Sequence, residues 1–481
     1  MPNACCLVPY SSDNGTFIYL NSQENKMATP PPVTDTLARF VAETAYSTIS
    51  EKTITNAKMH ILDILGVALA AVATPVAAIA LDYCARVSNS NEASIWGTPA
   101  KSSVPMAAFA NGLLAHALDF DDWEDSIHAG HPTSMVTGAA LSLSETLGAS
   151  GKDLLKAYVF GIEVLTKISA AGPNLHDRGF HSTPVLGSIG AAVACASLLK
   201  LVPDQIKAAL GVAASGCSGI HRQQGSMVKP FHAGNAARNG VEAALLAEKG
   251  FTADAAIFEA PRGFCDTFFG KGTCDYEKMI TNIGKPYFLE SPGLGLKMHP
   301  CSAPQFLAAD AALQLKHEHQ IRFEDVAKIE VSIPPERYQR HYHAEVKTGL
   351  RGKFAINYVV ALCILEGKLE IATFTDEKAN QPRVQEALSK VKVIVDESIP
   401  EPGRYCPVTV ELKNGTAFSY TATIAKGAPQ NPLTEKEVLD KFHGNARTVI
   451  SERQTEELIG AVQHLETVGN LKTLVELLIP S

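Results

Sequence analysis

The sequence predicts a mainly α protein, with a large all-helical domain and a smaller α+β domain. Two observations lead to this fold class. Apolar residues recur at helical spacing almost without interruption from about residue 35 to residue 259, whereas strand-like alternation appears only beyond about residue 290. The chain also has 481 residues, which is more than one simple hydrophobic core accommodates. We therefore expect two domains of different composition.

The helical domain is expected over residues 33–288. It opens with VTDTLARFVAETA, in which Thr and Asp residues provide capping signals and Leu37, Phe40 and Val41 follow at helical spacing. Later stretches such as VLGSIGAAVACASLLKL are rich in Gly and Ala, which permits close approach between helices. The preceding residues 1–32 resemble neither a signal peptide nor an Arg-rich transit peptide, so we expect a disordered extension there.

The smaller α+β domain is expected over residues 289–426. Three segments of it alternate as strands do: 327–334, 389–396 and 406–424. Asn414-Gly415 within the last segment predicts a hairpin turn, and GKFAINYVVALCILEG predicts a helix between the first two segments. NPLTEKEVLDKFHGNA then returns to a helical pattern. We therefore expect residues 427–481 to rejoin the helical domain, as discontinuous domains allow.

The composition, 46% hydrophobic and 19% charged, is that of an ordinary globular protein. A net charge of −8 provides no basic footprint for nucleic acid.

The uncharged segment Ile64–Leu81 is rich in Ala and broken at Thr74-Pro75, which favours two buried helices over a membrane span. The ten cysteines form no CxxC pair, which indicates reduced thiols inside the cell. We expect a cytoplasmic rather than mitochondrial protein, with neither nucleic acid nor membrane as a partner.

One acidic stretch, LDFDDWEDSIHAGHP at residues 118–132, concentrates groups that could perform chemistry. It has none of the ligand spacings typical of zinc or calcium sites, so we expect no metal there. Leu118, Phe120 and Trp123 interleave the acids, which places part of the stretch inside. A buried Asp119 would gain a raised pKa and serve as a base. The other acids are expected to form a solvated rim: Asp121, Asp122, Glu124 and Asp125.

Four further stretches contain candidate residues. Lys229 and His232, three residues apart at the start of a predicted helix, suit either a carboxylate receptor or a solvated loop. His181 precedes a Gly- and Ala-rich helix and is either a proton carrier or a packed core residue. Lys297 enters the small domain in LKMHPCSAPQF, which has no signature of a cysteine hydrolase. Tyr338 follows the first predicted strand, and the residues alone leave open whether it lies on the surface or in a site.

Several motifs together resemble the MmgE/PrpD family of 2-methylcitrate dehydratases, cis-aconitate decarboxylases and iminodisuccinate epimerases. They include WGTPAKSSVPMAAFANGLLAHALDFDD, FHSTPVLGSIGAAVA and MVKPFHAGNAARNGVEAALLAEKGF, and the resemblance runs from about Val33 to the C-terminus. It implies a helical domain built from both chain ends, a smaller α+β domain and a homodimer. It also implies an active site between the domains that binds a small tricarboxylate and uses neither a metal nor an organic cofactor.

The resemblance also implies which residues act. The expected catalytic residues are Asp119, His131, His181, Lys229 and Tyr338. The expected substrate-binding residues are Lys229 and Lys297, which the resemblance implies, together with His232 and Ser302, which their neighbourhood in the sequence suggests. Removing a proton next to a carboxylate builds negative charge, which lysines stabilise, while a base takes the proton and an acid protonates the leaving group.

The most specific expectation is dehydration of 2-methylcitrate or a longer 2-alkylcitrate. It rests on departures from the family pattern at Trp123, Ser302 and Phe306, because bulky apolar groups would form walls for an alkyl arm. Decarboxylation of cis-aconitate to itaconate is the alternative within the lyases, and epimerisation of an imino acid is a third reaction. A binding protein that keeps the fold without catalysis is the alternative of another class.

Overall fold

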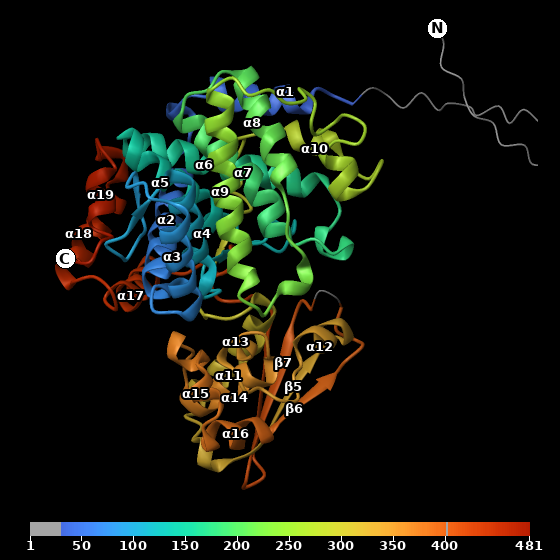
Figure 1. Ribbon diagram of the computed structural model, residues 1–481. Coiled ribbons are helices and arrows are strands. Elements are labelled where there is room, and N and C mark those ends of the chain that lie inside the picture. The colour runs from blue at the N-terminus through green and yellow to red at the C-terminus, as the bar shows by residue number, and fades with distance from the viewer. Residues whose placement is uncertain (1–29, 401–402) are drawn as a thin grey trace, which may run out of the picture.

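The computed structural model describes residues 30–400 and 403–481. The disordered extension expected at residues 1–32 lies almost wholly outside the described residues, and the first helix starts at Val33. Helices dominate and the strands gather mainly in the C-terminal part, so the predicted mainly α fold class is confirmed. Figure 1 shows a larger helical body above and a smaller α+β body below.

The helical body contains helices packed at several angles around a core rich in small residues. Its helices are α1 (Val33–Glu43), α2 (Glu51–Ala71), α3 (Pro75–Val87), α4 (Val104–Ala117), α5 (Pro132–Leu147), α6 (Gly151–Ala171), α7 (Ser182–Leu198), α8 (Pro203–Gly216), α9 (Val228–Glu248) and α10 (Tyr276–Ile280). At the crossing of α4 and α5, a Cβ added to Gly138 would lie 2.8 Å from the backbone nitrogen of Gly112. The small residues therefore let these two helices approach closely.

The apolar segment around Thr74-Pro75 forms two helices, as predicted. The Thr74 side chain accepts a hydrogen bond from the backbone N–H of Ala77, and Pro75 occupies the first position of α3. By length and composition α2 could cross a membrane, but most of its apolar window is buried within the molecule. Its burial is that of a core helix.

The smaller body has a mixed four-stranded sheet in the order β6-β5-β7-β8. Its strands are β5 (Val326–Ile333), β6 (Val391–Val395), β7 (Cys406–Leu412) and β8 (Ala417–Ala422). β5 is parallel to β6 and antiparallel to β7, and the β7–β8 hairpin turns at Gly415, which has φ +84°. Several helices pack beside the sheet: α11 (Phe306–Glu318), α12 (Pro335–His341), α13 (Gly349–Gly352), α14 (Ile356–Glu366), α15 (Asp376–Ala379) and α16 (Pro382–Ser389). The predicted strands and hairpin are confirmed.

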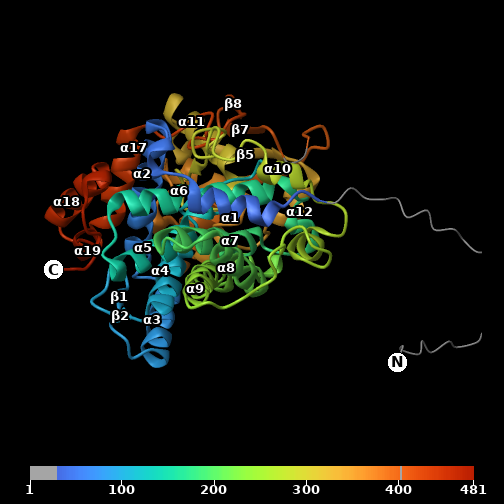
Figure 2. The same cartoon turned by 90° about the horizontal axis from the view of Figure 1, so that it is seen from above.

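After the sheet the chain returns to the helical body. The last helices are α17 (Glu435–Ala446), α18 (Glu452–Gln463) and α19 (Lys472–Glu476), and Figures 1 and 2 both show them beside α2 and α5. Phe442 of α17 is fully buried in the helical core, where a Cβ added to Gly66 of α2 would lie 2.7 Å from its ring. Both ends of the described chain therefore stabilise the same core.

The acidic stretch lies where the two hydrophobic cores meet. Leu118 and Phe120 belong to the helical core, whereas Trp123 packs into the core of the smaller body. Trp123 is part of the short strand β3 (Asp122–Trp123), which pairs with β4 (Gly295–Leu296) at the start of the smaller body. This pairing brings residues from distant parts of the chain to the loop that contains Asp119.

Candidate active site

Asp119 lies in the tight loop that follows α4. Its φ of +52° is in the left-handed region, which Asp adopts more readily than most residues. The backbone N–H of Asp119 donates to the carbonyl of His116, so the chain turns directly after the helix. The side chain is directed into the protein and is 6% exposed.

Two lysines converge on one oxygen of Asp119. The Nζ of Lys229, in the first turn of α9, lies 2.7 Å from Asp119 Oδ1. The Nζ of Lys297, directly after β4, lies 2.6 Å from the same oxygen. The Lys297 side chain is fully buried and that of Lys229 is 6% exposed. The fold thus brings the predicted carboxylate-binding lysines together around the predicted active-site acid.

The expected raised pKa of Asp119 is wrong. Burial alone would raise it, but Lys229 and Lys297 outweigh burial and hold the pKa of Asp119 well below its ordinary value. The same ion pair acts on the lysines. Burial would lower the pKa of Lys297, yet the Asp119 and Asp121 carboxylates raise it. Asp119 is therefore a permanently ionised anchor for cations and a weak base.

The expected solvated rim is also wrong for most of its members. Asp121, Asp122 and Glu124 are buried, and only Asp125 is exposed. Asp122 accepts hydrogen bonds from the backbone N–H and the hydroxyl of Thr133 at the start of α5. The Glu124 carboxylate accepts hydrogen bonds from the backbone N–H groups of residues 126, 127 and 129. The folded-back loop offers these donors, which compensate for burial of the acids.

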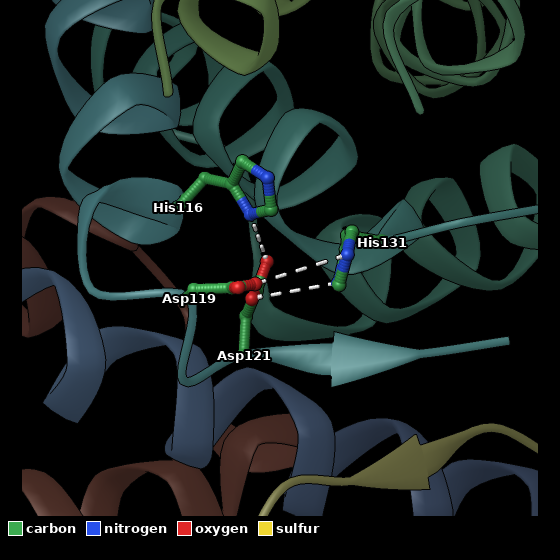
Figure 3. A group of neighbouring side chains, drawn as sticks. All are labelled: His116, Asp119, Asp121 and His131. Carbon is green, nitrogen blue, oxygen red and sulfur yellow. Dashed lines mark hydrogen bonds and ion pairs between the residues drawn. The ribbon is translucent and has the colours of Figure 1, made fainter. Parts of the chain in front are cut away.

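His131 sits at the N-terminal end of α5 and faces Asp119 (Figure 3). Its Nδ1 lies 2.6 Å from the carbonyl oxygen of Asp122, so Nδ1 donates and Nε2 keeps a lone pair. Nε2 lies 3.9 Å from Asp119 Oδ1. Burial, together with Lys229 and Lys297, holds the pKa of His131 well below its usual value. His131 is thus a neutral imidazole whose free nitrogen faces the ion-pair cluster.

His181 and His232 form a second imidazole pair. His181 directly precedes α7 and His232 lies in α9, and their Nδ1 atoms are 3.0 Å apart. Both rings are buried, so one Nδ1 donates to the other. Burial lowers the pKa of His232 to about 4, and the positive charge of Lys229 acts in the same direction. His181 therefore has a buried hydrogen-bond partner and lies within electrostatic reach of Lys229.

Tyr338 and Ser302 have contacts with other residues. Tyr338, in α12, stacks on Tyr342 with ring centroids 4.8 Å apart. The backbone N–H of Ser302 donates to the carbonyl of Lys353. Within residues 30–400 and 403–481, neither side chain forms a hydrogen bond or ion pair with Asp119, Lys229 or Lys297. Their expected roles stay predictions.

The sequence reasoning missed two buried groups at the site. His116, in the last turn of α4, donates from Nδ1 to Asp121 Oδ2 at 2.7 Å. Lys353 donates to the carbonyls of Leu118 and Pro300, and burial lowers its pKa to about 8. The signals were present, because each is a polar residue in a quoted stretch: His116 in AHALDFDD, which supports the family resemblance, and Lys353 in GKFAINYVVA, which predicts a helix.

Four side chains at this place have the donor atoms of a metal site. Ligand atoms of His116, Asp119, Asp121 and His131 all lie within 4.8 Å of one another (Figure 3). However, the two lysine ammonium groups already bind Asp119 Oδ1 at 2.6 and 2.7 Å. A further cation would be repelled by them and would have to displace them from the carboxylate. The donor set therefore fits a metal poorly, and the lysines provide the positive charge.

Comparison with known proteins identifies the family. A model of the MmgE/PrpD N-terminal domain matches residues 35–277, and a model of the C-terminal domain matches residues 299–467. The chain belongs to the MmgE/PrpD family. The resemblance inferred from its motifs is thereby confirmed.

Two kinds of MmgE/PrpD relative are similar to this chain. The cis-aconitate decarboxylases of Mus musculus and Homo sapiens are 28% and 29% identical to it, over 93% of this chain and 93% and 94% of theirs. The mitochondrial 2-methylcitrate dehydratase of Yarrowia lipolytica is 24% identical, over 77% of this chain and 75% of its own. The homodimer and the cytoplasmic location expected from the sequence stay predictions.

Proposed function

We propose that this protein is a lyase acting on a citrate-like tricarboxylic acid, and that its reaction is decarboxylation of cis-aconitate to itaconate. The observation that carries the proposal is the convergence of Lys229 and Lys297 on Asp119, beside the neutral imidazole of His131. Similarity to the mammalian cis-aconitate decarboxylases along nearly the whole of both chains supports this choice of reaction.

The lysines suit a substrate with several carboxylates. Asp119 holds both ammonium groups in a buried place, so they are oriented before the substrate arrives. A bound carboxylate would share or take over these contacts from Asp119. Preorganised cations of this kind stabilise negative charge that develops in the transition state, and they act more strongly where water is excluded.

Decarboxylation of cis-aconitate needs one proton at carbon. The bond to the departing carboxylate breaks, its electron pair forms the new double bond, and the old double bond takes up a proton at its CH carbon. The products are itaconate and carbon dioxide. This step needs a proton donor, and the ionised Asp119 holds no proton to give, so His131 and His181 are the proton carriers among the predicted residues.

Dehydration of 2-methylcitrate is the second candidate. The free Nε2 of His131 suits the removal of a proton next to a carboxylate, and the similarity to 2-methylcitrate dehydratases supports this reaction. Two of the residues expected to form walls for an alkyl arm, Trp123 and Phe306, contact each other. Trp123 and Phe306 pack edge to face in the core of the smaller body, with ring centroids 5.0 Å apart and both side chains buried.

The test uses the purified full chain and ¹H NMR in D₂O. With cis-aconitate we expect itaconate that contains one deuterium in its methylene group beside the carboxylate, together with released carbon dioxide. With 2-methylcitrate and longer 2-alkylcitrates, dehydration would produce an alkene without carbon dioxide. An alkene from these substrates and no itaconate from cis-aconitate would replace the first proposal by the second. Binding without turnover of any of them would overturn both.

A further inference from the structure

His116 and Asp121 form a buried dyad beside the residues to which the proposed reaction assigns roles. His116 Nδ1 lies 2.7 Å from Asp121 Oδ2, and both side chains are completely buried. The other oxygen of Asp121 lies 3.6 Å from Nδ1 of His131, so one carboxylate lies between two imidazoles. In Figure 3 the Nδ1 edge of His116 faces Asp121, and its opposite edge points away from that carboxylate.

The partners of this dyad determine where its proton lies. Burial alone would raise the pKa of Asp121, but His116 and His131 lower it, so the carboxylate is ionised and only accepts hydrogen bonds. His116 must therefore donate from Nδ1, which leaves the lone pair on Nε2. Burial lowers the pKa of His116 by more than the Asp121 carboxylate raises it, so the ring is neutral before substrate binds. This is the arrangement in which a carboxylate orients an imidazole for proton transfer.

The Nε2 of His116 has no protein partner within the described residues. It is one of the buried polar atoms for which they provide no hydrogen bond. Leaving such an atom unpaired is costly, because it loses its hydrogen bonds to water on folding. His116 is also close to the predicted chemistry. Its ring centroid lies 4.6 Å from that of His131, and it is within electrostatic reach of Lys229, Asp119 and the His181–His232 pair.

We propose that His116 is a proton carrier of the lyase reaction and that Asp121 is its positioning residue. The inference rests on the proposed function. In the decarboxylation, the Nε2–H bond of the His116 imidazolium breaks as the new C–H bond forms on the substrate. The carbon–carboxylate bond breaks at the same time, carbon dioxide leaves, and the neutral ring takes its next proton from water. The anionic substrate and Asp121 favour the imidazolium before the transfer.

Kinetics of two variants test the assignment. His116→Gln keeps a side chain that can bond Asp121, and it should lower kcat at least about a hundredfold with little change in KM, as expected for loss of general acid–base catalysis. Asp121→Asn should lower kcat to a similar extent because it no longer selects the Nδ1–H tautomer. The matched control is His60→Gln, which replaces another buried imidazole with a lowered pKa, in α2. It should keep kcat even where it lowers Tm.

Chemical rescue separates proton transfer from a structural role. Imidazole and substituted imidazoles added to His116→Ala should restore part of kcat, and the restored rate should vary with the pKa of the azole. Wild-type kcat in His116→Gln, or rescue that is absent or independent of azole pKa, would overturn the proposal.

A measurement without turnover distinguishes this inference from the proposed function. Histidine ¹⁵N NMR of the full chain, assigned by loss of the signal in His116→Gln, reports the tautomer of His116 directly. We expect Nδ1–H in the wild type and a mixed or Nε2–H state in Asp121→Asn. An Nε2–H wild-type ring would overturn the proton-carrier role even in an active lyase. Failure to turn over any tricarboxylate would instead overturn the proposed function.

Discussion

Lys297 binds Asp119 through two atoms of the same residue. Its Nζ lies 2.6 Å from the carboxylate Oδ1 and 3.0 Å from the backbone carbonyl oxygen. The double contact fixes both the position and the direction of the ammonium group, and it joins the entry of the smaller body to the loop after α4. A cation held in this way needs little reorganisation when an anionic substrate arrives.

Replacing Lys297 by Met should damage both activity and stability. We expect kcat/KM to fall at least about a hundredfold, as for other losses of a preorganised electrostatic contact. The free energy of unfolding should fall by up to about 3 kcal/mol, because Asp119 stays buried with one ammonium partner fewer. Steady-state kinetics and urea denaturation measure the two effects. Lys436→Met, which breaks an exposed pair with Asp440 in α17, should change neither.

Lys353 should produce a pH dependence of substrate binding. Its pKa is lowered by burial from 10.5 to about 8, while Asp119 and Cys301 act against the decrease. Below about pH 8 the ammonium group is charged and adds to the attraction for an anion. As the pH rises through about 8 the charge is lost, so KM for the tricarboxylate should rise. Lys353→Arg keeps its charge at high pH, so the rise in KM should begin at a higher pH than in the wild type. A rise in KM at the same pH in both proteins would show that Lys353 is not its cause.

The same shift affects stability with a defined sign. The folded state disfavours protonated Lys353, so the penalty is full below about pH 8 and disappears as the pH rises from there towards 10.5. The free energy of unfolding, measured with denaturant, should therefore rise between pH 7 and pH 9.5 by less in Lys353→Met than in the wild type. An equal pH dependence of the two proteins would exclude a lowered pKa.

Gly130 should be required for placing His131. Its φ is +76°, and a Cβ there would overlap the Thr183 hydroxyl. Gly130→Ala should therefore lower kcat by shifting the loop that contains His131, in addition to the cost of about 1 kcal/mol of an Ala at positive φ. Gly179→Ala is the matched control, because Gly179 has φ +84° but nothing within 4 Å of an added Cβ. Equal kinetic effects of the two substitutions would show that backbone strain alone is responsible.

Trp123 should affect stability more than substrate choice. Its ring packs edge to face on Phe306 and covers Gly295, where an added Cβ would lie 2.7 Å from the indole. Trp123→Ala should therefore cost about 3–5 kcal/mol of unfolding free energy. Trp123→Phe keeps part of the packing, and its relative rates with cis-aconitate and longer 2-alkylcitrates should match those of the wild type. A shift of preference towards or away from long alkyl arms would restore the apolar-wall interpretation.

Periodicity and spacing were sufficient for much of this protein. The helical repeats, the small residues at helix crossings such as Gly112, and the Asn414-Gly415 hairpin depend on neighbours in the sequence, so the fold class could be predicted. The order of the motifs was enough to infer the family, which the domain models confirm. The residue types at Asp119 and His131 likewise drew attention to the stretch where the cations gather.

The charge state of that stretch was decided only by tertiary structure. Asp119 meets Lys229 and Lys297 across sequence separations of 110 and 178 residues. A pKa depends on the charges within a few ångströms, and these come from three separate segments, so the sequence alone predicted a raised pKa where the fold produces a lowered one. The same holds for the buried acids and for Trp123. Composition predicts whether such a side chain is polar or apolar, whereas its partners, and therefore its chemistry, depend on which distant segments the two cores bring together.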